Sequence, residues 1–325
     1  MGFGAYAVRR LLYTIPVTLG VMVLLFLLFE AIGGSPARLV LGKSATAESI
    51  AEWDAHNGYD LPLLISWEGL LRERSLVGLF DAQLPRYLWR LSRWDFGTSY
   101  VTNQPVRRMI FEGIIPSLSL TVPIFIAGFL ASIGIALMCA LHRKGHLDRI
   151  VVFLSVALMS IPYLGYILVG QFWLGYAWGW FPIWGYEGIS HLVLPWLIGV
   201  VSGLGGNVRF YRTVMLDQVR ADFIRTAFAK GCTTRRVLWV HLLRNAMIPI
   251  LTQVVITIPF LYTGSLLLES FFGIPGLGYI GVHALHTGDR PVLSALVFVG
   301  SLLFVLFNVL TDLAYVWMDR RIRLG

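Results

Sequence analysis

The chain has 325 residues, of which 57% are hydrophobic and only 14% are charged. Soluble globular proteins carry about 25% charged residues, so this composition excludes an ordinary soluble protein and is typical of a membrane protein. The formal net charge of +8 does not require a nucleic-acid partner, because the basic residues gather in short segments beside apolar runs. The two cysteines, Cys139 and Cys232, are too few for a disulfide framework. We therefore expect a lipid bilayer around the chain and no nucleic acid.

The N-terminal part of the chain predicts a first membrane span. Arg9 and Arg10 precede an apolar run from Leu11 to Phe29, which at about 1.5 Å per residue is long enough to cross the hydrocarbon core. A signal peptide is the alternative, but its apolar core would be only about 7–15 residues long. Residues 1–32 are therefore expected to hold a cytoplasmic N-terminus and the first transmembrane helix.

Residues 33–112 form a long polar segment that we expect on the external side. Because it is longer than about 60 residues, its arginines do not determine the orientation of the chain. Gly42-Lys43-Ser44 is similar to the end of a phosphate-binding loop, but Ala37 stands where that loop requires its first glycine. No nucleotide site, and hence no bound cofactor, is expected in this chain.

Five further apolar stretches complete the prediction of an all-α integral membrane protein with six transmembrane helices. They cover about residues 114–141, 150–173, 191–207, 246–272 and 292–317. An aromatic cluster after the third is typical of the headgroup level; it consists of Trp173, Tyr176, Trp178, Trp180, Phe181 and Trp184. The expected domains are the external segment 33–112, a membrane core 113–317 and a short cytoplasmic tail 318–325.

The distribution of basic residues predicts the orientation. Eight Lys and Arg residues lie between Arg209 and Arg244, and the two ends of the chain and the segment 142–149 hold more. The two short loops on the other side hold only Arg290. Under the positive-inside rule, both termini and the basic stretch face the cytoplasm.

The stretch Asp217–Pro249 predicts two short amphipathic helices joined at Gly231. Val219, Phe223 and Ala227 recur at a spacing of four on the first helix. Lys230 and Gly231 are suited to close it, and either Thr233 or Thr234 can cap the second helix.

The same stretch carries a motif. It reads Arg225-Thr226-Ala227-Phe228-Ala229-Lys230-Gly231, then Arg235-Arg236-Val237, then His241-Leu242-Leu243-Arg244-Asn245-Ala246-Met247-Ile248-Pro249. It resembles the cytoplasmic EAA loop of ABC-importer permeases in the dipeptide, oligopeptide and nickel branch. The general pattern has Glu-Ala-Ala in place of Arg225-Thr226-Ala227, and this departure is the one that the branch makes. Asp95-Phe96-Gly97-Thr98-Ser99 and Gly273-Ile274-Pro275-Gly276-Leu277-Gly278 also resemble that branch, whereas the piece at about 69–92 is longer than its usual spacing.

The resemblance implies a permease subunit of the bacterial inner membrane that forms half of a translocation pathway for peptides or peptide-like solutes. The implied partners are a second similar permease, two ATPase subunits that bind ATP and Mg, and an extracytoplasmic solute-binding protein. The coupling loop 209–246 would dock into an ATPase. Its contact residues would be Arg225, Thr226, Ala227, Lys230, Gly231, Arg235 and Arg236. The alternative for this segment is an ordinary basic loop held by anionic headgroups.

Glu269, Tyr262 and Gln171 are the candidates for the translocation path. Charges at membrane depth are costly and are retained at span ends or in cavities, and Glu269 directly precedes the Gly273–Gly278 loop. The alternative places this carboxylate in interfacial water, and Tyr262 and Gln171 in helix packing. His142 with His146, and His283 with His286, have ligand-like spacing but no nearby Cys or carboxylate partner, so no metal site is expected.

Two other classes of protein compete with the permease. A self-sufficient secondary transporter or channel would need internal repeats and ion ligands within the spans, and neither is evident. A membrane enzyme is disfavoured because no H-E-x-x-H or G-x-S-x-G motif occurs in a span, so no catalytic residue is expected. The sequence does not specify the solute.

Overall fold

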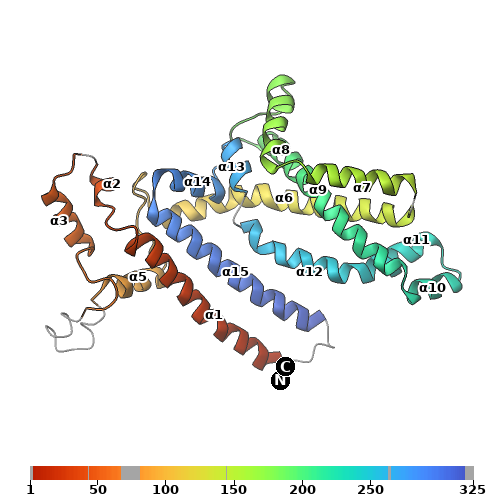
Figure 1. Ribbon diagram of the computed structural model, residues 1–325, viewed down its shortest axis with the longest axis horizontal. Helices are drawn as coiled ribbons and strands as arrows, with labels where there is room; N and C mark the ends of the chain where they lie inside the picture. The colour runs from red at the N-terminus through yellow and green to blue at the C-terminus, as the bar shows by residue number, and fades with distance from the viewer. Residues whose placement is uncertain (1–2, 43, 67–80, 144, 263–264, 319–325) are drawn as a thin grey trace. The chain divides into compact units, whose positions relative to one another are not determined.

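The computed structural model describes every residue except 1–2, 43, 67–80, 144, 263–264 and 319–325 (Figure 1). This described part is helical. It contains no β-strand, and its one isolated β-bridge joins Thr98 and Pro105. The chain divides into two compact units. Unit 1 contains residues 1–113 and 280–325, and unit 2 contains residues 114–279.

Unit 1 is built on two long helices. Helix α1 (Phe3–Leu25) continues into a π-helical turn, η1 (Phe26–Ala31), and packs along α15 (Arg290–Met318). The described residues of segment 33–112 add three short helices, α2 (Ala37–Leu41), α3 (Ala47–Asn57) and α5 (Gln83–Ser92). Helix α3 begins at Thr46, whose hydroxyl accepts a hydrogen bond from the Ser49 amide, as an N-cap residue should.

Side-chain contacts attach the external segment to α15. The Tyr87 hydroxyl lies 2.6 Å from the Ser294 hydroxyl, and the rings of Phe96 and Phe298 are 6.0 Å apart. Burial raises the pKa of Tyr87 to about 12, so this phenol remains neutral at physiological pH. The segment is therefore packed against the spans rather than hanging free of them.

Unit 2 contains four long helical stretches. Helix α6 (Val106–Leu141) leads into it, followed by α7 (His146–Met159), α8 (Tyr163–Gly170) with a π-helical turn η3 (Gln171–Ala177), and α9 (Ile189–Val219). The chain bends by 92° between α7 and α8, at Ser160-Ile161-Pro162. Proline disfavours the helical conformation in the residue before it and lacks the N–H needed to continue the helix, which explains the break there.

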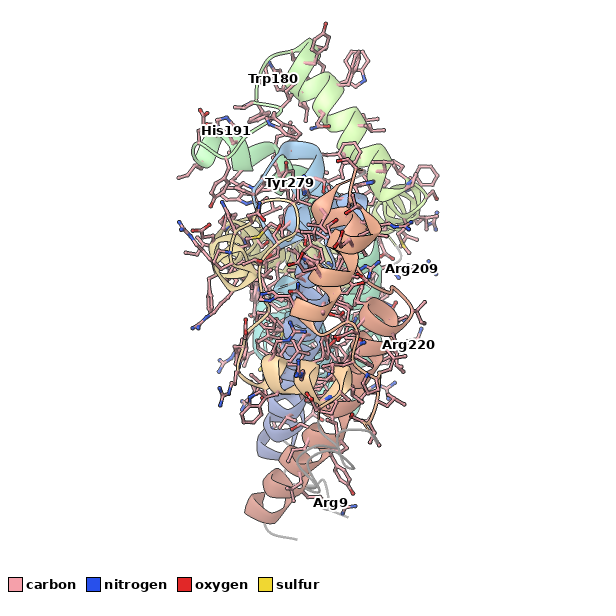
Figure 2. All side chains as sticks on the ribbon, turned by 90° about the vertical axis from the view of Figure 1, so that its left-hand side faces the viewer. Arg9, Trp180, His191, Arg209, Arg220 and Tyr279 are labelled. Carbon is pink, nitrogen blue, oxygen red and sulfur yellow. The ribbon has the colours of Figure 1, made fainter. Side chains whose placement is uncertain are left out.

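The rest of the helices follow a turn after α9. They are α10 (Asp222–Ala229), α11 (Thr234–Arg236), a π-helical turn η4 (Val237–Leu242), α12 (Leu243–Tyr262), α13 (Leu266–Phe272) and α14 (Leu277–Thr287). Within unit 2, Trp180 and His191 lie towards one end, and Arg209 and Arg220 lie towards the other (Figure 2). The aromatic and basic ends predicted from the sequence are thus separate in this unit.

The helices confirm an all-α integral membrane protein. Five helices are long and apolar enough to cross a membrane, and the bent pairs α7–α8 and α13–α14 raise the number to as many as seven. The predicted six spans fall within this range. The sequence prediction placed a loop at Gly273–Gly278, where α13 and α14 meet, but it missed the bend between α7 and α8 and the helix α14.

Several predicted boundaries were wrong. Helix α9 continues to Val219 rather than ending near Asn207, so the predicted loop 209–246 begins inside a helix. The predicted fifth span 246–272 is two helices, α12 and α13. Most of the predicted tail 318–325, and the first part of the extra piece at 69–92, lie outside the described residues.

Candidate functional site

Unit 2 encloses a cavity of about 250 Å³ between faces of α6, α9 and α12, with Tyr163 of α8 and Ser265 closing it. Each of the three helices contributes residues four apart, which places them on one helical face. The lining residues in this register are Thr121, Phe125 and Phe129 on α6; Gly199, Gly203, Asn207 and Tyr211 on α9; and Gln253, Thr257 and Leu261 on α12.

The cavity wall is uncharged and mixes polar with apolar side chains. No acidic or basic side chain lines it among the described residues. The Thr121 hydroxyl lies 2.8 Å from the Leu261 carbonyl oxygen, and the Tyr163 and Ser265 hydroxyls are 3.2 Å apart. Such a wall can hydrogen-bond an uncharged amide group without selecting for a charge.

Two packed hydrophobic cores adjoin the cavity. We call them the hairpin core and the loop core. The hairpin core contains Ala136, Leu137, Ala140, Tyr211, Met215, Ile224, Ala227, Val237, Leu238, Leu242, Ala246 and Ile250. The loop core contains Leu120, Ile167, Leu192, Leu194, Ile198, Leu268, Phe272 and Ile274. The cavity residues Phe129, Tyr211 and Val254 belong to or pack against the hairpin core, and Ile124 and Tyr163 pack against the loop core.

Helix α10 ends in a tight glycine turn. Gly231 has φ +80°, the left-handed conformation that glycine adopts without steric cost. The Cys232 amide donates to the Ala227 carbonyl at 3.2 Å, and the Gly231 amide donates to the Phe228 carbonyl at 2.9 Å. These two bonds form a Schellman motif. The prediction that Lys230 and Gly231 close the first hairpin helix is confirmed.

The hairpin has one face towards its own core and one towards the outside. Ile224 and Ala227 are buried in the hairpin core, which anchors α10. The outward face is exposed, and of the predicted contact residues it carries Arg225, Thr226, Lys230, Gly231, Arg235 and Arg236. Next to the turn, Thr233, Arg235, Arg236 and Trp239 line a shallow pocket of about 300 Å³. The basic face therefore has no cover within the described chain.

Two details of the predicted hairpin helices were wrong. Val219 belongs to α9 and not to the first hairpin helix. The second hairpin helix is not separate, because α11, η4 and α12 run on without a gap. Ala227 is 5% exposed and so contacts its own chain. Thr233 occupies the predicted cap position, but its side chain makes no capping hydrogen bond.

Glu269 lies on α13 and is fully buried, with a relative exposure of 0%. Its carboxylate accepts hydrogen bonds from the Ser117 hydroxyl at 2.9 Å and from the Ser265 amide at 3.1 Å. It also accepts from the amides of Gly278 and Tyr279, at 2.7 and 3.1 Å. Four donors compensate the cost of burying this charge. The residue ties α6, α13 and the start of α14 together.

The glycines of the Gly273–Gly278 loop make room for this arrangement. A Cβ atom on Gly276 would lie 2.4 Å from Glu269 Oε2, and one on Gly278 would lie 2.8 Å from the same oxygen. The Leu277 amide donates to the Ser117 hydroxyl at 2.8 Å. The loop follows the carboxylate so closely that only glycine fits at these two positions.

Of the predicted path residues, Glu269 and Gln171 are not among the residues that line the cavity. Glu269 holds the loop instead, and the Gln171 amide donates to the carbonyl of Phe271 at 2.8 Å. The side chain of Tyr262 lies outside the described residues. Among the described residues, no cluster of three or more His, Cys, Asp and Glu side chains could hold a metal ion.

Sequence reasoning missed the cavity residues. The available signal was the four-residue spacing of polar and small residues within apolar spans, as in Gly199-Gly203-Asn207 and Gln253-Thr257. The prediction named Glu269, Tyr262 and Gln171 instead. Charge at membrane depth identified a hydrogen-bonded structural carboxylate, Glu269, whereas the cavity wall combines uncharged polar residues with apolar ones and glycines.

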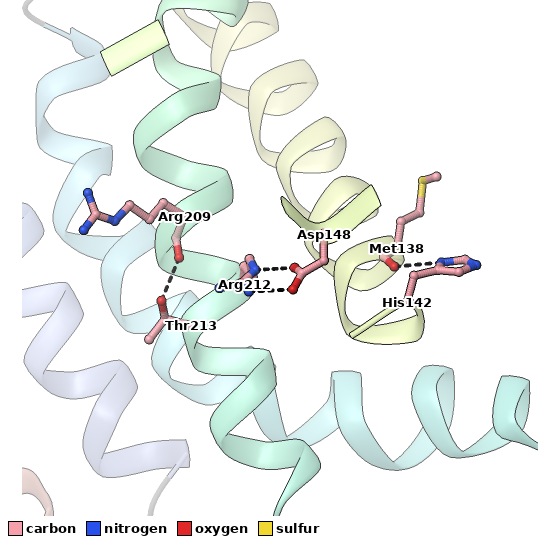
Figure 3. A network of polar contacts seen from close by, with 6 residues as sticks. All are labelled: Met138, His142, Asp148, Arg209, Arg212 and Thr213. Carbon is pink, nitrogen blue, oxygen red and sulfur yellow. Dashed lines mark hydrogen bonds and ion pairs between the residues drawn. The ribbon is translucent and has the colours of Figure 1, made fainter. Parts of the chain in front are cut away.

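An ion pair joins α7 to α9 (Figure 3). The Arg212 guanidinium donates to both oxygens of Asp148, at 2.6 and 2.8 Å. The Asp148 side chain is 7% exposed and that of Arg212 is 23% exposed. Arg212 follows Tyr211, a residue of both the cavity wall and the hairpin core. A bidentate pair of this kind fixes orientation as well as distance.

Comparisons with known proteins agree with this architecture. Residues 132–324 match the family "Binding-protein-dependent transport system inner membrane component", and residues 4–121 match its N-terminal counterpart. The glutathione transport system permease protein of Salmonella paratyphi A is 35% identical over 320 residues, 98% of each chain. A probable peptide ABC transporter permease of Sinorhizobium fredii is 31% identical, covering 98% of this chain and 99% of that protein.

A dipeptide transport system permease of Alkalihalophilus pseudofirmus is 29% identical over 347 residues, 98% of this chain and 99% of that protein. These relatives are matched along nearly their whole length, so the likeness includes the external segment, the cavity helices and the hairpin. The chain therefore belongs to the family of binding-protein-dependent transport system inner membrane components, and it is a multi-pass membrane permease subunit rather than an enzyme.

Proposed function

We propose that this chain forms half of the translocation pathway of an ATP-driven importer for peptides or peptide-like solutes. The observation that carries the proposal is the uncharged cavity of unit 2, which shares Tyr211 with the core that anchors the α10 hairpin. A displacement of α10 would reach the cavity wall through packed side chains, which transmit motion because protein interiors are close-packed.

The solute class follows from the cavity wall and from the relatives. Hydroxyl and amide groups of Thr121, Asn207, Gln253 and Thr257 face a space without charge. They suit the backbone amides that all peptides share, while leaving side chains of either sign tolerated. The names of the relatives specify glutathione, peptides or dipeptides. Selection among such solutes would belong to a separate binding protein.

The exposed face of the hairpin is the proposed docking site for an ATPase. Lys230, Arg235 and Arg236 present three positive charges around a turn, and acidic side chains on a partner would pair with them. Arg225 already lies 3.6 Å from Asp222 on the same exposed face. Ala227 serves as the anchor of the helix, in place of the partner contact predicted from the motif.

The family acts together with other membrane permeases, ATPases and binding proteins. For this chain we propose a second similar permease, two ATPase subunits that hold ATP and Mg, and an extracytoplasmic solute-binding protein. The proposed location is the bacterial inner membrane, with both termini and the hairpin on the cytoplasmic side, as the basic residues predict.

A charge-reversal experiment tests the proposal. The double variant Arg225→Glu/Lys230→Glu should lose co-purification with the ATPase subunits and lose solute uptake in proteoliposomes of the complex. Arg143→Glu is the matched control, because Arg143 is also an exposed basic residue of unit 2 but lies in a different loop. Uptake by liposomes that contain this chain alone would contradict the proposal and support a self-sufficient transporter or channel.

A further inference from the structure

Helix α5 has one buried face and one exposed face that carries tryptophan and arginine. Tyr87 and Leu91 are 6% and 3% exposed, whereas Trp89 is 60% exposed. The helix lies in the segment 33–112 that the sequence predicts to be external. Nothing in the packing of unit 1 or in solute transport requires an exposed aromatic side chain there.

Contacts place α5 beside two helices that are long and apolar enough to cross a membrane. The Tyr87 ring lies 5.7 Å from the ring of Phe26, and its hydroxyl lies 2.6 Å from that of Ser294. Phe26 and Ser294 belong to the stretches Leu12–Ala31 and Arg290–Leu310, which are long and apolar enough to cross a membrane. At about 1.5 Å per residue, each is roughly 6–8 Å inside the nearer end of its span.

The residues after α5 lie deeper still. The Trp94 ring makes an edge contact with Phe298 at 6.3 Å, and Phe298 is about 12 Å inside the start of its span by the same helical rise. Trp94 is nevertheless 41% exposed. A helix with its apolar side chains about 5–10 Å below the headgroups is typical of an interfacial amphipathic helix.

The charges on α5 divide into paired and unpaired arginines. Arg86 forms an ion pair with Asp81 at 2.6 Å. The Arg93 guanidinium stacks over the Trp89 ring at 4.3 Å, which leaves its N–H donors available at the ring edge. Arg90 has no ion-pair partner among the described residues and is exposed. Guanidinium groups bind phosphate oxygens with two parallel hydrogen bonds.

We infer that α5 is a lipid-binding helix, with Trp89 and Trp94 inserted among acyl chains and Arg90 and Arg93 holding the phosphate of an anionic phospholipid. The inference goes beyond the proposed import function and requires only that α1 and α15 cross the membrane. In the proposed orientation the lipid belongs to the outer leaflet. Helix α5 would thereby fix the height of this part of the chain at the membrane surface.

Fluorescence quenching by lipid tests the tryptophans. The whole complex is placed in nanodiscs of phosphatidylcholine brominated near the headgroup end of its acyl chains. Trp89→Phe and Trp94→Phe should each remove a lipid-quenched component of the emission. Trp53→Phe is the control, because Trp53 stacks on Tyr59 at 5.6 Å within the external segment. Unchanged lipid quenching in both variants, with a loss of quenching by aqueous iodide instead, would overturn the inference.

Bound lipid tests the arginines. In nanodiscs that mix phosphatidylglycerol with phosphatidylcholine, native mass spectrometry should show enrichment of phosphatidylglycerol on the complex. Arg90→Gln and Arg93→Gln should each reduce that enrichment about fivefold, the effect of one basic residue near an anionic surface. Arg86→Gln should leave it unchanged, because Asp81 already neutralises Arg86. Equal enrichment in all three variants would contradict the phosphate contact even if the protein folds normally.

Discussion

Unit 2 contains two helix-ending turns, at Gly231 and Gly273, that have the same backbone conformation but different surroundings. We call these turns glycine elbows. At Gly231 and Gly273 the backbone is left-handed, with φ of +80° and +65°. In each, the next residue's amide donates to the carbonyl five positions back, from Cys232 to Ala227 at 3.2 Å and from Ile274 to Glu269 at 2.9 Å. Both are helix ends of the Schellman type.

The surroundings of the two glycines are opposite. A Cβ atom on Gly273 would lie 2.4 Å from the ring of Trp184, whereas one on Gly231 would meet nothing within 4 Å. The Gly273 elbow contains a buried carboxylate with four hydrogen-bond donors, and the Gly231 elbow exposes Lys230, Arg235 and Arg236. One elbow is completed by its own chain. The other presents charges that a partner can satisfy, which is why we place ATPase docking there.

Removing the buried carboxylate should have the largest effect. Glu269→Ala leaves the Ser117 hydroxyl and three backbone amides without an acceptor, and each unsatisfied buried donor costs about 1–3 kcal/mol. We expect a loss of about 4 kcal/mol of stability after partial relaxation, measured by thermal unfolding in detergent. Glu112→Gln is the control, because Glu112 is exposed in its pair with Arg108. Equal melting temperatures of the Glu269→Ala and Glu112→Gln variants would show that Glu269 does not stabilise the fold.

Filling the space beside Trp184 should have the next largest effect. Gly273→Ala combines about 1 kcal/mol of left-handed strain with an overpacking cost of about 2 kcal/mol against the ring. Gly231→Ala should show the strain alone, about 1 kcal/mol. Adding Trp184→Ala to Gly273→Ala should relieve the overpacking part. Identical destabilisation by the two glycine variants would show that space around Gly273 is not limiting.

Substitutions in the Asp148–Arg212 pair test whether this ion pair stabilises the end of unit 2 that carries the hairpin. Asp148→Asn leaves Arg212 without its anionic partner, and we expect a loss of about 2 kcal/mol, below the range for fully buried pairs because Arg212 is partly exposed. The swapped variant Asp148→Arg/Arg212→Asp should recover part of this loss in the same unfolding assay. If Asp148→Asn does not lower the stability and the swapped variant is not more stable than the single variant, the ion pair does not stabilise unit 2.

The substitution Gly231→Val should have a small effect on stability and a large effect on transport. Gly231→Val strains the turn because a β-branched residue resists a positive φ, yet the open space around it lets the helices insert. We expect normal membrane expression with solute uptake reduced at least about tenfold, since the docking face is reoriented. Gly231→Asn is the matched control, because asparagine tolerates this conformation. Normal uptake by the Gly231→Val variant would show that the conformation of this turn is not needed for coupling to the ATPase.

The elbows also show how far sequence reasoning reaches. The Gly231 turn was predicted correctly because Lys230-Gly231 is a local helix-ending signal. The family motif identified the hairpin, but only packing shows that Ala227 points inwards among Ile224 and Tyr211. Glu269 was correctly singled out as unusual at membrane depth. Its partner Ser117 is 152 positions away in sequence, and no local pattern predicts a pairing over that separation.

The apolar runs by themselves determined that this is a helical membrane protein, because backbone groups inside a bilayer must bond within their own helix. The basic segments determined the predicted orientation, and the hairpin motif indicated the family. Tertiary structure alone decided which faces of α6, α9 and α12 surround the cavity and which charge is buried as a lock. Those outcomes depend on contacts between residues far apart in the chain, and lipid-facing and cavity-facing positions both read as apolar or small in sequence.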